Sequence, residues 1–140
     1  MLFLLDTNVV SEPSRPRPDA RVVDWVARTP IDDLAVSSIT VGEIQTGISL
    51  LAPGARREKL SRWLDEELPD QFGSRMLPVD VPVAREWGRI AARARNHGWG
   101  LSAGDGLLLA TAAIHYLVLV TRNERDFQGR GVDVYNPWNA

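Results

Sequence analysis

Three acidic residues and one amide hold equivalent places in the sequence, each at the end of a predicted strand or near the start of a predicted helix. They are Asp6, Glu43, Asp105 and Asn123. Asp6 directly follows the apolar run at residues 2–5, where burial of an unpaired carboxylate is costly. Strand ends and helix starts of a parallel α/β sheet meet at one edge, where ligands bind. We therefore expect these four side chains to gather in one small space.

Carboxylates that lie close together repel one another, and a divalent cation relieves that repulsion. The chain has no cysteine, and its single lysine, Lys59, lies inside a predicted helix and is not placed to neutralise the acids. Oxygen ligands favour a hard ion, so we expect Mg²⁺, with Mn²⁺ as an alternative, held by Asp6, Glu43 and Asp105. Such an ion activates water and stabilises charge on a scissile phosphate. The pattern predicts phosphoryl transfer or phosphodiester hydrolysis.

Each acid also has a structural interpretation that the sequence leaves open. The spacings Thr40-x-x-Glu43 and Ser102-x-x-Asp105 match a capping box, in which an acid bonds back to the N-cap amide of its helix. Asp6 would form an Asx-turn with the backbone that follows it. The joint occurrence of the acids at predicted element ends favours the metal site over three independent caps.

Other polar residues near these positions carry weaker signals. Asn123 and Asp126 are common turn residues, and Asp126 is a candidate for a supporting role in the metal site. Neither histidine is placed as a general base. His97 lies at a predicted helix end and His115 late in a predicted buried helix, so we expect surface or structural roles for both.

Length and composition are typical of one soluble globular domain over residues 1–140, with 44% apolar and 24% charged residues. The absence of cysteine excludes disulfides and thiolate metal sites and suits a cytoplasmic protein. The first apolar run is too short for a signal peptide, and no run approaches the roughly 20 apolar residues of a membrane span. The net charge of −2 gives no global basic surface for nucleic acid. We expect a cytoplasmic protein with no membrane segment.

Apolar runs alternate with amphipathic segments along the chain. Strands are predicted at residues 2–5, 33–39, 75–80, 117–121 and 132–135. Helices are predicted at residues 19–29, 40–52, 54–68, 82–98 and 102–116, and the proline-rich segment 11–20 is predicted as a loop. Pro78 places the third strand at a sheet edge. Because the strands lack period-two alternation, the order predicts an α/β fold with a mainly parallel sheet.

Five sequence motifs together resemble those of PIN-domain nucleases, specifically VapC toxins of bacterial toxin–antitoxin pairs in the FitB-like branch. The motifs are LLDTNVVSEP, ITVGEIQTGI, SAGDGLLLATA, VTRNERDF and the closing NPW. They occur in the expected order, and the resemblance covers essentially the whole chain. It implies a three-layer sandwich around a short, mainly parallel sheet of about five strands flanked by helices.

The resemblance also implies a metal-dependent endoribonuclease. Asp6, Glu43 and Asp105 match the first three acids of the family, and Asn123 stands where the fourth acidic position falls. Thr7 matches a hydroxyl that bonds Asp6 or a metal-bound water. The glycine at position 106 departs from the alanine-rich pattern after the third acid, and we expect it to leave room near the metal.

Three kinds of partner follow from the same resemblance. The toxins form homodimers, and a small VapB-like antitoxin inserts a basic group into the acidic pocket, with DNA bound only through the antitoxin complex. The substrate is RNA. Candidate residues for holding its phosphates are Arg15, Arg17, Arg122 and Arg125.

Three other protein classes share part of this pattern. Receiver domains and haloacid-dehalogenase-type phosphatases both need a lysine near their acids, and Lys59 does not supply it; the phosphatases also need an acid where this chain has Asn8. A non-enzymatic PIN domain, acting mainly as a protein-binding and DNA-autoregulatory partner of its antitoxin, is favoured only by Asn123. The intact acids argue against it, because buried acids without a function cost stability.

Overall fold

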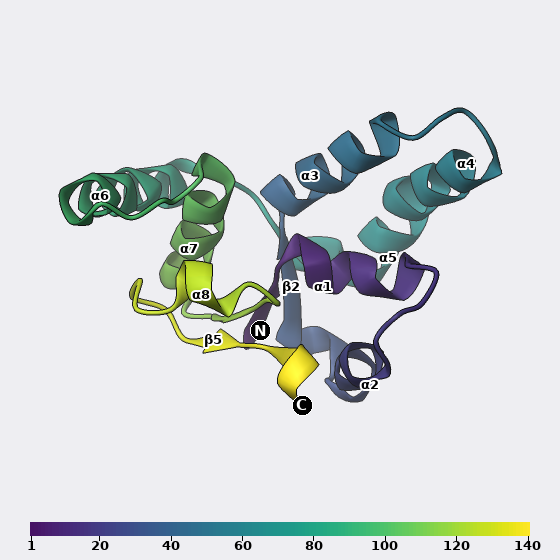
Figure 1. The fold of residues 1–140 in the computed structure, drawn as a ribbon, viewed down its shortest axis with the longest axis horizontal. Helices are drawn as coiled ribbons and strands as arrows, with labels where there is room; N and C mark the ends of the chain where they lie inside the picture. The colour runs from purple at the N-terminus through teal and green to yellow at the C-terminus, as the bar shows by residue number, and fades with distance from the viewer.

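The computed structural model describes residues 1–140 and contains one five-stranded sheet in the order β3-β2-β1-β4-β5 (Figure 1). The strands are β1 (Phe3–Leu5), β2 (Leu34–Ser37), β3 (Met76–Leu77), β4 (Val118–Val120) and β5 (Val134–Tyr135). Every neighbouring pair is parallel. The prediction of a mainly parallel sheet is confirmed, and β3 lies at the edge, as Pro78 indicated.

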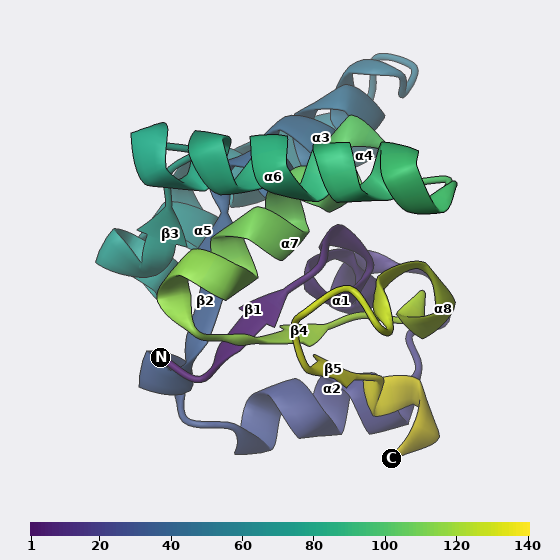
Figure 2. The ribbon, with the colours of Figure 1, turned by 90° about the vertical axis from the view of Figure 1, so that its left-hand side faces the viewer.

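Helices cover both faces of the sheet. The α-helices are α1 (Thr7–Ser11), α2 (Ala20–Arg28), α3 (Ser38–Ser49), α4 (Ala55–Arg62), α5 (Leu68–Phe72), α6 (Val81–His97), α7 (Ala103–His115) and α8 (Glu124–Phe127). Shorter turns are η1 (Glu12–Ser14), η2 (Ile31–Asp33), η4 (Gly73–Arg75) and η5 (Pro137–Asn139), and η3 (Trp63–Glu67) is a π-helical segment. Figures 1 and 2 show α6 and α7 on one face and α1, α2, α4 and α5 on the other.

Two apolar clusters form the core, one on each face of the sheet. Leu4 and Leu119 belong to the cluster under α6 and α7, whereas Leu5 and Val120 belong to the cluster under α1 to α5. Successive strand residues point to opposite faces, so both residues of each pair are buried. This explains the continuous apolar runs in the sequence and establishes the three-layer arrangement.

Helix termini follow the sequence signals in most places. Asp19 caps α2 by accepting a hydrogen bond from the Arg21 amide at 2.9 Å. Helix α6 starts after Asp80, and it ends at Gly98, which adopts a left-handed conformation with φ of 69°. None of the helices is both long and apolar enough to cross a membrane.

Predicted boundaries are wrong in the segments at residues 11–20 and 54–68. Residues 11–20 are not a continuous loop, because α1 and η1 extend through Ser14 before an irregular stretch at residues 15–19. Pro13 is compatible with this helical turn because it occupies one of the first two positions of η1, where a missing N–H costs little. The helix predicted at 54–68 continues to Phe72, with the π-helical η3 in its middle.

Gly106 does not leave room near the acids, contrary to the expectation from the sequence. A methyl group at this position would lie 3.0 Å from two ring atoms of Trp87 on α6. Gly104 is the glycine that approaches the acids, because a methyl group there would lie 3.7 Å from Oε1 of Glu43. Gly106 therefore allows α6 and α7 to pack closely.

Replacing each glycine by alanine tests this assignment. Alanine at either position gains helix propensity of up to about 1 kcal/mol. At Gly106 the new methyl group displaces Trp87, and overpacking of this kind costs about 1–3 kcal/mol. We expect G106A to be less stable than G104A by about 1 kcal/mol or more in urea denaturation. Equal stability of the two variants would contradict the packing role of Gly106.

Candidate active site

Asp6 lies between central strand β1 and helix α1, and only 6% of its surface is exposed. Its Oδ1 accepts a hydrogen bond from the Thr7 amide at 2.7 Å, which makes it the N-cap of α1. Its Oδ2 accepts a hydrogen bond from the Thr121 hydroxyl at 2.7 Å. Asp6 therefore caps α1 through Oδ1, as the Asx-turn interpretation expected, while its Oδ2 binds the Thr121 hydroxyl. The helix cap and a role in the acidic site are compatible.

Thr121 is a site residue that the sequence reasoning missed. It is completely buried directly after β4, and its hydroxyl oxygen also accepts a hydrogen bond from the Asn123 amide at 3.0 Å. Thr121 therefore connects the carboxylate of Asp6 to the backbone of the fourth predicted position. The only sequence signal was a hydroxyl residue directly after an apolar strand.

Asn8 makes a second link that was not predicted. Its side-chain amide donates to Oδ2 of Asp6 at 3.4 Å, and its oxygen accepts from the Arg122 amide at 3.3 Å. The segment after β1 and the segment after β4 are thus joined by two contacts, one through Thr121 and one through Asn8.

Glu43 is not a capping residue. Helix α3 begins at Ser38, and the Ser37 hydroxyl accepts from the Ile39 amide at 3.2 Å as the N-cap. Glu43 is consequently the sixth residue of α3 rather than a first-turn residue, and Thr40 lies buried inside the helix. The capping-box interpretation fails, and the carboxylate is free to interact with the other acids.

Asp105 lies in the first turn of α7, as predicted. The Ser102 hydroxyl accepts a hydrogen bond from the Asp105 amide at 3.2 Å and caps the helix. The half-buried carboxylate of Asp105 remains near the other acids. The capping serine therefore fixes the first turn of the helix on which this carboxylate is carried.

The structure brings Asp6, Glu43 and Asp105 close enough to affect one another's ionisation. Burial raises the pKa of all three carboxyl groups. The charge of Asp6 further raises the pKa of Glu43 and of Asp105. The hydrogen bond from Thr121 lowers the pKa of Asp6 in part. None of the three carboxylates forms an ion pair with arginine, lysine or histidine.

Thr7 supplies the site with an unsatisfied hydroxyl. Its Oγ1 is buried and has no partner at hydrogen-bonding distance. It nevertheless lies close enough to Glu43 to lower the pKa of that carboxyl group. A buried hydroxyl without a partner is costly, so this group is suited to contact a ligand or a bound water.

Asn123 and Asp126 lie on the exposed side of the site. Asn123 is the N-cap residue of α8, but its side chain makes no capping hydrogen bond. The charge of Asp126 raises the pKa of Asp6 and of Asp105. Both residues line a shallow depression of about 300 Å³ formed by residues 122–126.

The four predicted arginines fall into two groups. Arg122 and Arg125 line the depression beside Asn123, and the Arg122 guanidinium lies 5.4 Å from the ring centre of Trp138. Arg15 lies elsewhere, 3.7 Å from Glu12. Arg17 is exposed in the irregular stretch after η1.

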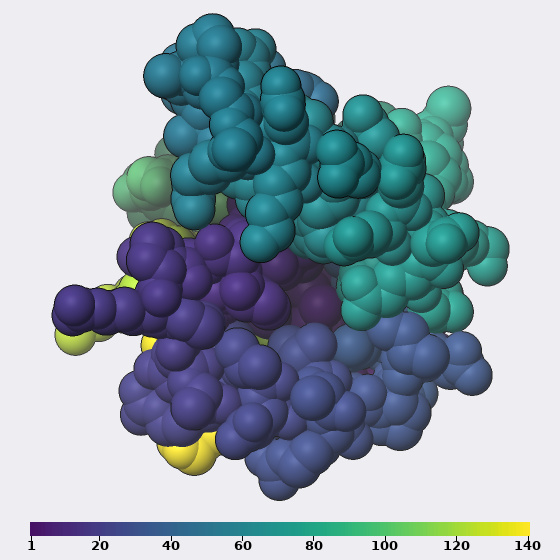
Figure 3. All heavy atoms as spheres, turned by 90° about the vertical axis from the view of Figure 1, so that its right-hand side faces the viewer, coloured from purple at the N-terminus to yellow at the C-terminus, as the bar shows by residue number.

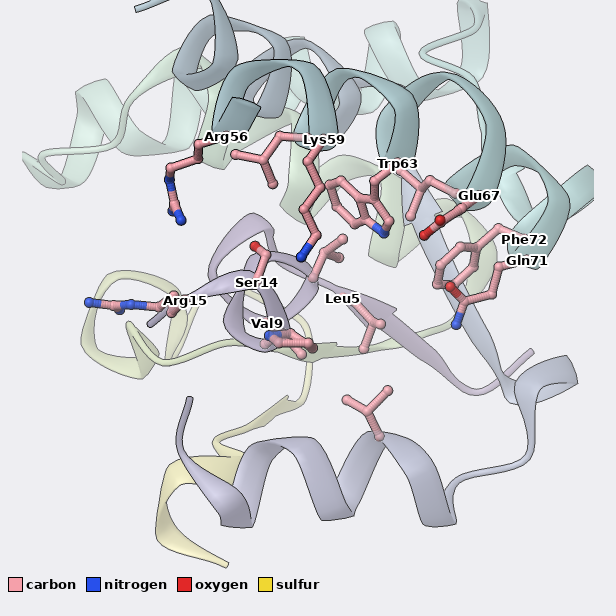
Figure 4. A pocket seen from close by; sticks show the side chains of 15 residues that line it. Leu5, Val9, Ser14, Arg15, Arg56, Lys59, Trp63, Glu67, Gln71 and Phe72 are labelled. Carbon is pink, nitrogen blue, oxygen red and sulfur yellow. The ribbon is translucent and has the colours of Figure 1, made fainter. Parts of the chain in front are cut away.

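Arg15 lies at the rim of a separate apolar cavity of about 560 Å³ between α1 and the α4–α5 helices. Figure 3 shows the hollow between the purple N-terminal segment and the teal helices, and Figure 4 shows the side chains that line it. Apolar residues such as Val9, Trp63 and Phe72 form its walls, and Arg56 and Lys59 lie near its opening. None of the three acids lines this cavity.

A metal ion at the acidic site would need oxygen ligands, and the three carboxylates provide only oxygen. No group of three histidine or acidic side chains converges tightly enough to form a cage made entirely of protein ligands. Mg²⁺ does not need such a cage, because it takes one or two carboxylates directly and keeps several waters. The donor chemistry and the uncompensated charge fit a hydrated divalent cation.

Comparison with known proteins decides the family. The model of the PIN domain family matches residues 3–131. The chain belongs to the PIN domain family. This PIN domain is 41% identical over 138 residues to Toxin FitB of Neisseria gonorrhoeae, covering 99% of each chain. It is 34% identical over 137 residues to VapC ribonuclease Y4jK of Sinorhizobium fredii, covering 98% of each.

A solved structure of FitAB bound to an IR36 DNA fragment has the same fold as this PIN domain. The TM-score is 0.92 at 39% identity, over 98% of this chain and 96% of the other. The three-layer architecture expected from the sequence motifs is therefore confirmed.

The hydrogen bond between Thr121 and Asp6 gives a stability prediction. Hydrogen bonds to charged groups contribute about 1.5–3 kcal/mol. We expect T121V, which keeps the shape of the side chain but removes the hydroxyl, to lower the free energy of unfolding by about that amount in urea denaturation. T121S keeps the donor and is the matched control. A T121V variant as stable as T121S would show that the contact contributes little.

The raised pKa values predict that the metal-free PIN domain is more stable in mild acid than at neutral pH. Folded Asp6, Glu43 and Asp105 bind protons at higher pH than they do when unfolded, so stability falls as pH rises through their folded pKa values. Asp19, whose pKa is lowered by its hydrogen bond with Arg21, acts in the opposite direction only at lower pH.

Thermal unfolding in EDTA between about pH 5 and about pH 7.5 measures this effect. We expect the Tm to rise toward the acidic end and the D105N variant to show a flatter profile. An identical pH dependence in both proteins would contradict charge repulsion in the acidic site.

Proposed function

We propose that this PIN domain is a Mg²⁺-dependent endoribonuclease that acts in the cytoplasm as the toxin of a toxin–antitoxin pair. The observation that carries the proposal is the set of three carboxyl groups whose pKa values are raised, first by burial and then by neighbouring carboxylates, and which have no cationic partner. The similarity to Toxin FitB and to VapC ribonuclease Y4jK supports the biological role and the RNA substrate.

The residues of the site have separate tasks in this proposal. Asp6 is held in one orientation by the Thr121 hydroxyl and the Thr7 amide, and Glu43 and Asp105 complete the ligand set from α3 and α7. A divalent cation bound there supplies a water of lowered pKa and counter-charge for the scissile phosphate. The unsatisfied Thr7 hydroxyl is placed to orient a water next to Glu43.

The depression formed by residues 122–126 supplies two arginines, an amide and a carboxylate next to the three acids. Asn123 faces the same depression as Asp126, so either side chain is placed to contact a cation through water. Arg122 and Arg125 neutralise RNA phosphates at this rim. Arg15 lies at the rim of the apolar cavity and Arg17 in the exposed stretch after η1, so both would contact only a longer RNA segment.

An antitoxin is the second partner in this proposal. The acidic pocket attracts a guanidinium as well as a metal, because either cation relieves the same repulsion. The apolar cavity bordered by Arg56 and Lys59 would accept an amphipathic antitoxin segment with acidic flanks. The DNA in the structure of FitAB supports DNA binding by the complex with the antitoxin, and we propose a homodimer as the toxin unit.

A catalytically weak PIN domain that mainly binds its antitoxin is the alternative function. Asn123 favours it, because a neutral amide replaces an acid at the rim of the site. The two functions differ in whether the purified chain binds metal and cleaves RNA.

The deciding experiment is cleavage of labelled total tRNA and messenger RNA by purified, antitoxin-free protein in Mg²⁺ and in EDTA. We expect discrete cleavage in Mg²⁺ only. D6N should lower the rate more than about 100-fold, because even changes beside metal ligands cost 10–100-fold. D24N removes an equal charge from an exposed site on α2 and should leave the rate unchanged.

If no RNA is cleaved, calorimetric titration with Mg²⁺ or Mn²⁺ shows whether the protein binds metal. A folded protein that binds no metal and cleaves no RNA would contradict the nuclease and support the binding function. Metal binding without cleavage of either RNA pool would support the metal site and show that the substrate is absent from both pools.

A further inference from the structure

Three side chains outside the acidic site form a stack on the molecular surface. The His97 and Trp99 rings lie 5.3 Å apart between centroids and are nearly parallel, with an interplanar angle of 16°. The Arg130 guanidinium carbon lies 4.0 Å from the Trp99 ring centroid. We call these three residues the aromatic–arginine stack. It joins the turn after α6 to the segment after α8.

The Arg130 side chain in this stack is held in place but not neutralised. It forms no ion pair, and its Nε is buried without a hydrogen-bond partner. Contact with the Trp99 face fixes the guanidinium while its terminal N–H groups make no hydrogen bond to the protein. Such an arginine is ready to bind an anionic group without further ordering.

His97 presents a ring that the rest of the chain does not cover. It is exposed at the C-terminal end of α6, directly before Gly98 turns the chain. The half-buried Trp99 ring stacks against this ring. A planar base is the chemical group that such an open aromatic ring binds by stacking.

Short stretches of chain connect the aromatic–arginine stack to two residues of the acidic site. Trp99 precedes Asp105 by six residues, which limits their separation to about 20 Å at most, and Arg130 follows Asp126 by four. Figure 2 shows the C-terminal end of α6, the start of α7 and the segment around α8 on the same side of the molecule. A single strand of RNA that places one phosphate at the acids can therefore reach the stack with a nucleotide within a few positions of that phosphate.

We propose that His97, Trp99 and Arg130 form a nucleotide subsite for single-stranded RNA, in which a base stacks on His97 and a phosphate binds Arg130. The proposal rests on the proposed ribonuclease function. It adds a contact made by a nucleotide within a few positions of the scissile one, through stacking and phosphate binding rather than through metal. Because stacking accepts every base, the subsite contributes affinity and position more than sequence choice.

The test measures binding of a short, labelled, random-sequence single-stranded RNA by fluorescence anisotropy in EDTA, where cleavage does not interfere. H97A should weaken binding about fivefold or more, since loss of one stacked base has at least that effect. R130Q should weaken binding and reduce the slope of log affinity against log salt by about 0.7, as expected for one lost phosphate contact to a single strand. R28Q removes an arginine at the exposed end of α2 and is the control.

Two further variants separate a binding role from a structural one. W99F keeps an aromatic ring and should retain most of the affinity, whereas W99L should bind like H97A or more weakly. If W99L does not fold, as circular dichroism would show, H97A and R130Q decide the question, because they alter side chains that are exposed or half-buried. Affinities and salt slopes of H97A and R130Q equal to those of R28Q would overturn the subsite.

The outcome for the subsite is distinguishable from the outcome for the nuclease. Cleavage in Mg²⁺ with unchanged RNA binding in H97A and R130Q would overturn the subsite and keep the nuclease. Weakened binding in both variants without cleavage by the wild type would keep the subsite and overturn the nuclease. No RNA binding by the wild-type protein would overturn the subsite.

Discussion

The structure is organised around the carboxylate of Asp6, which lies buried at the end of its central strand with hydrogen bonds but no cationic partner. The Thr121 hydroxyl and the Thr7 amide satisfy its oxygens but add no positive charge. Glu43, Asp105 and Asp126 then add repulsion instead of relieving it. Hydrogen bonds thus fix the geometry of Asp6, whereas no positive side chain of the protein balances the charge of the three acids.

The rest of the fold brings the elements that carry these acids to one edge. The sheet is apolar on both faces, so helices must cover both, and their starts gather where the strands end. The C-terminal NPW motif contributes to this arrangement. The Asn136 amide donates to Glu124 of α8 at 3.1 Å, and the buried Trp138 ring lies under Arg122. The last residues of the chain therefore hold the outer rim of the site.

Sequence patterns predicted the elements well where the determining interactions are local. Asp19 and Ser102, the first residues of two predicted helical ranges, cap their helices, and Gly98, the last residue of a third, ends α6. Sequence patterns failed where packing or helix register decides the structure. Ser37, rather than Thr40, caps α3, so Glu43 lies one turn further into its helix than the motif indicated. Gly106 contacts Trp87 on another helix, which no pattern within α7 reveals.

The sequence by itself determined the kinds of chemical groups, their order and the elements that carry them, because strand and helix signals depend on neighbouring residues. It therefore predicted a parallel α/β sheet and an oxygen-rich site containing Asp6, Glu43 and Asp105. Only the tertiary structure showed that Thr121 binds Asp6 across 115 residues, and that Trp99 meets Arg130. Such contacts depend on strand register and on helix packing against a common sheet, and neither leaves a local signal in the sequence.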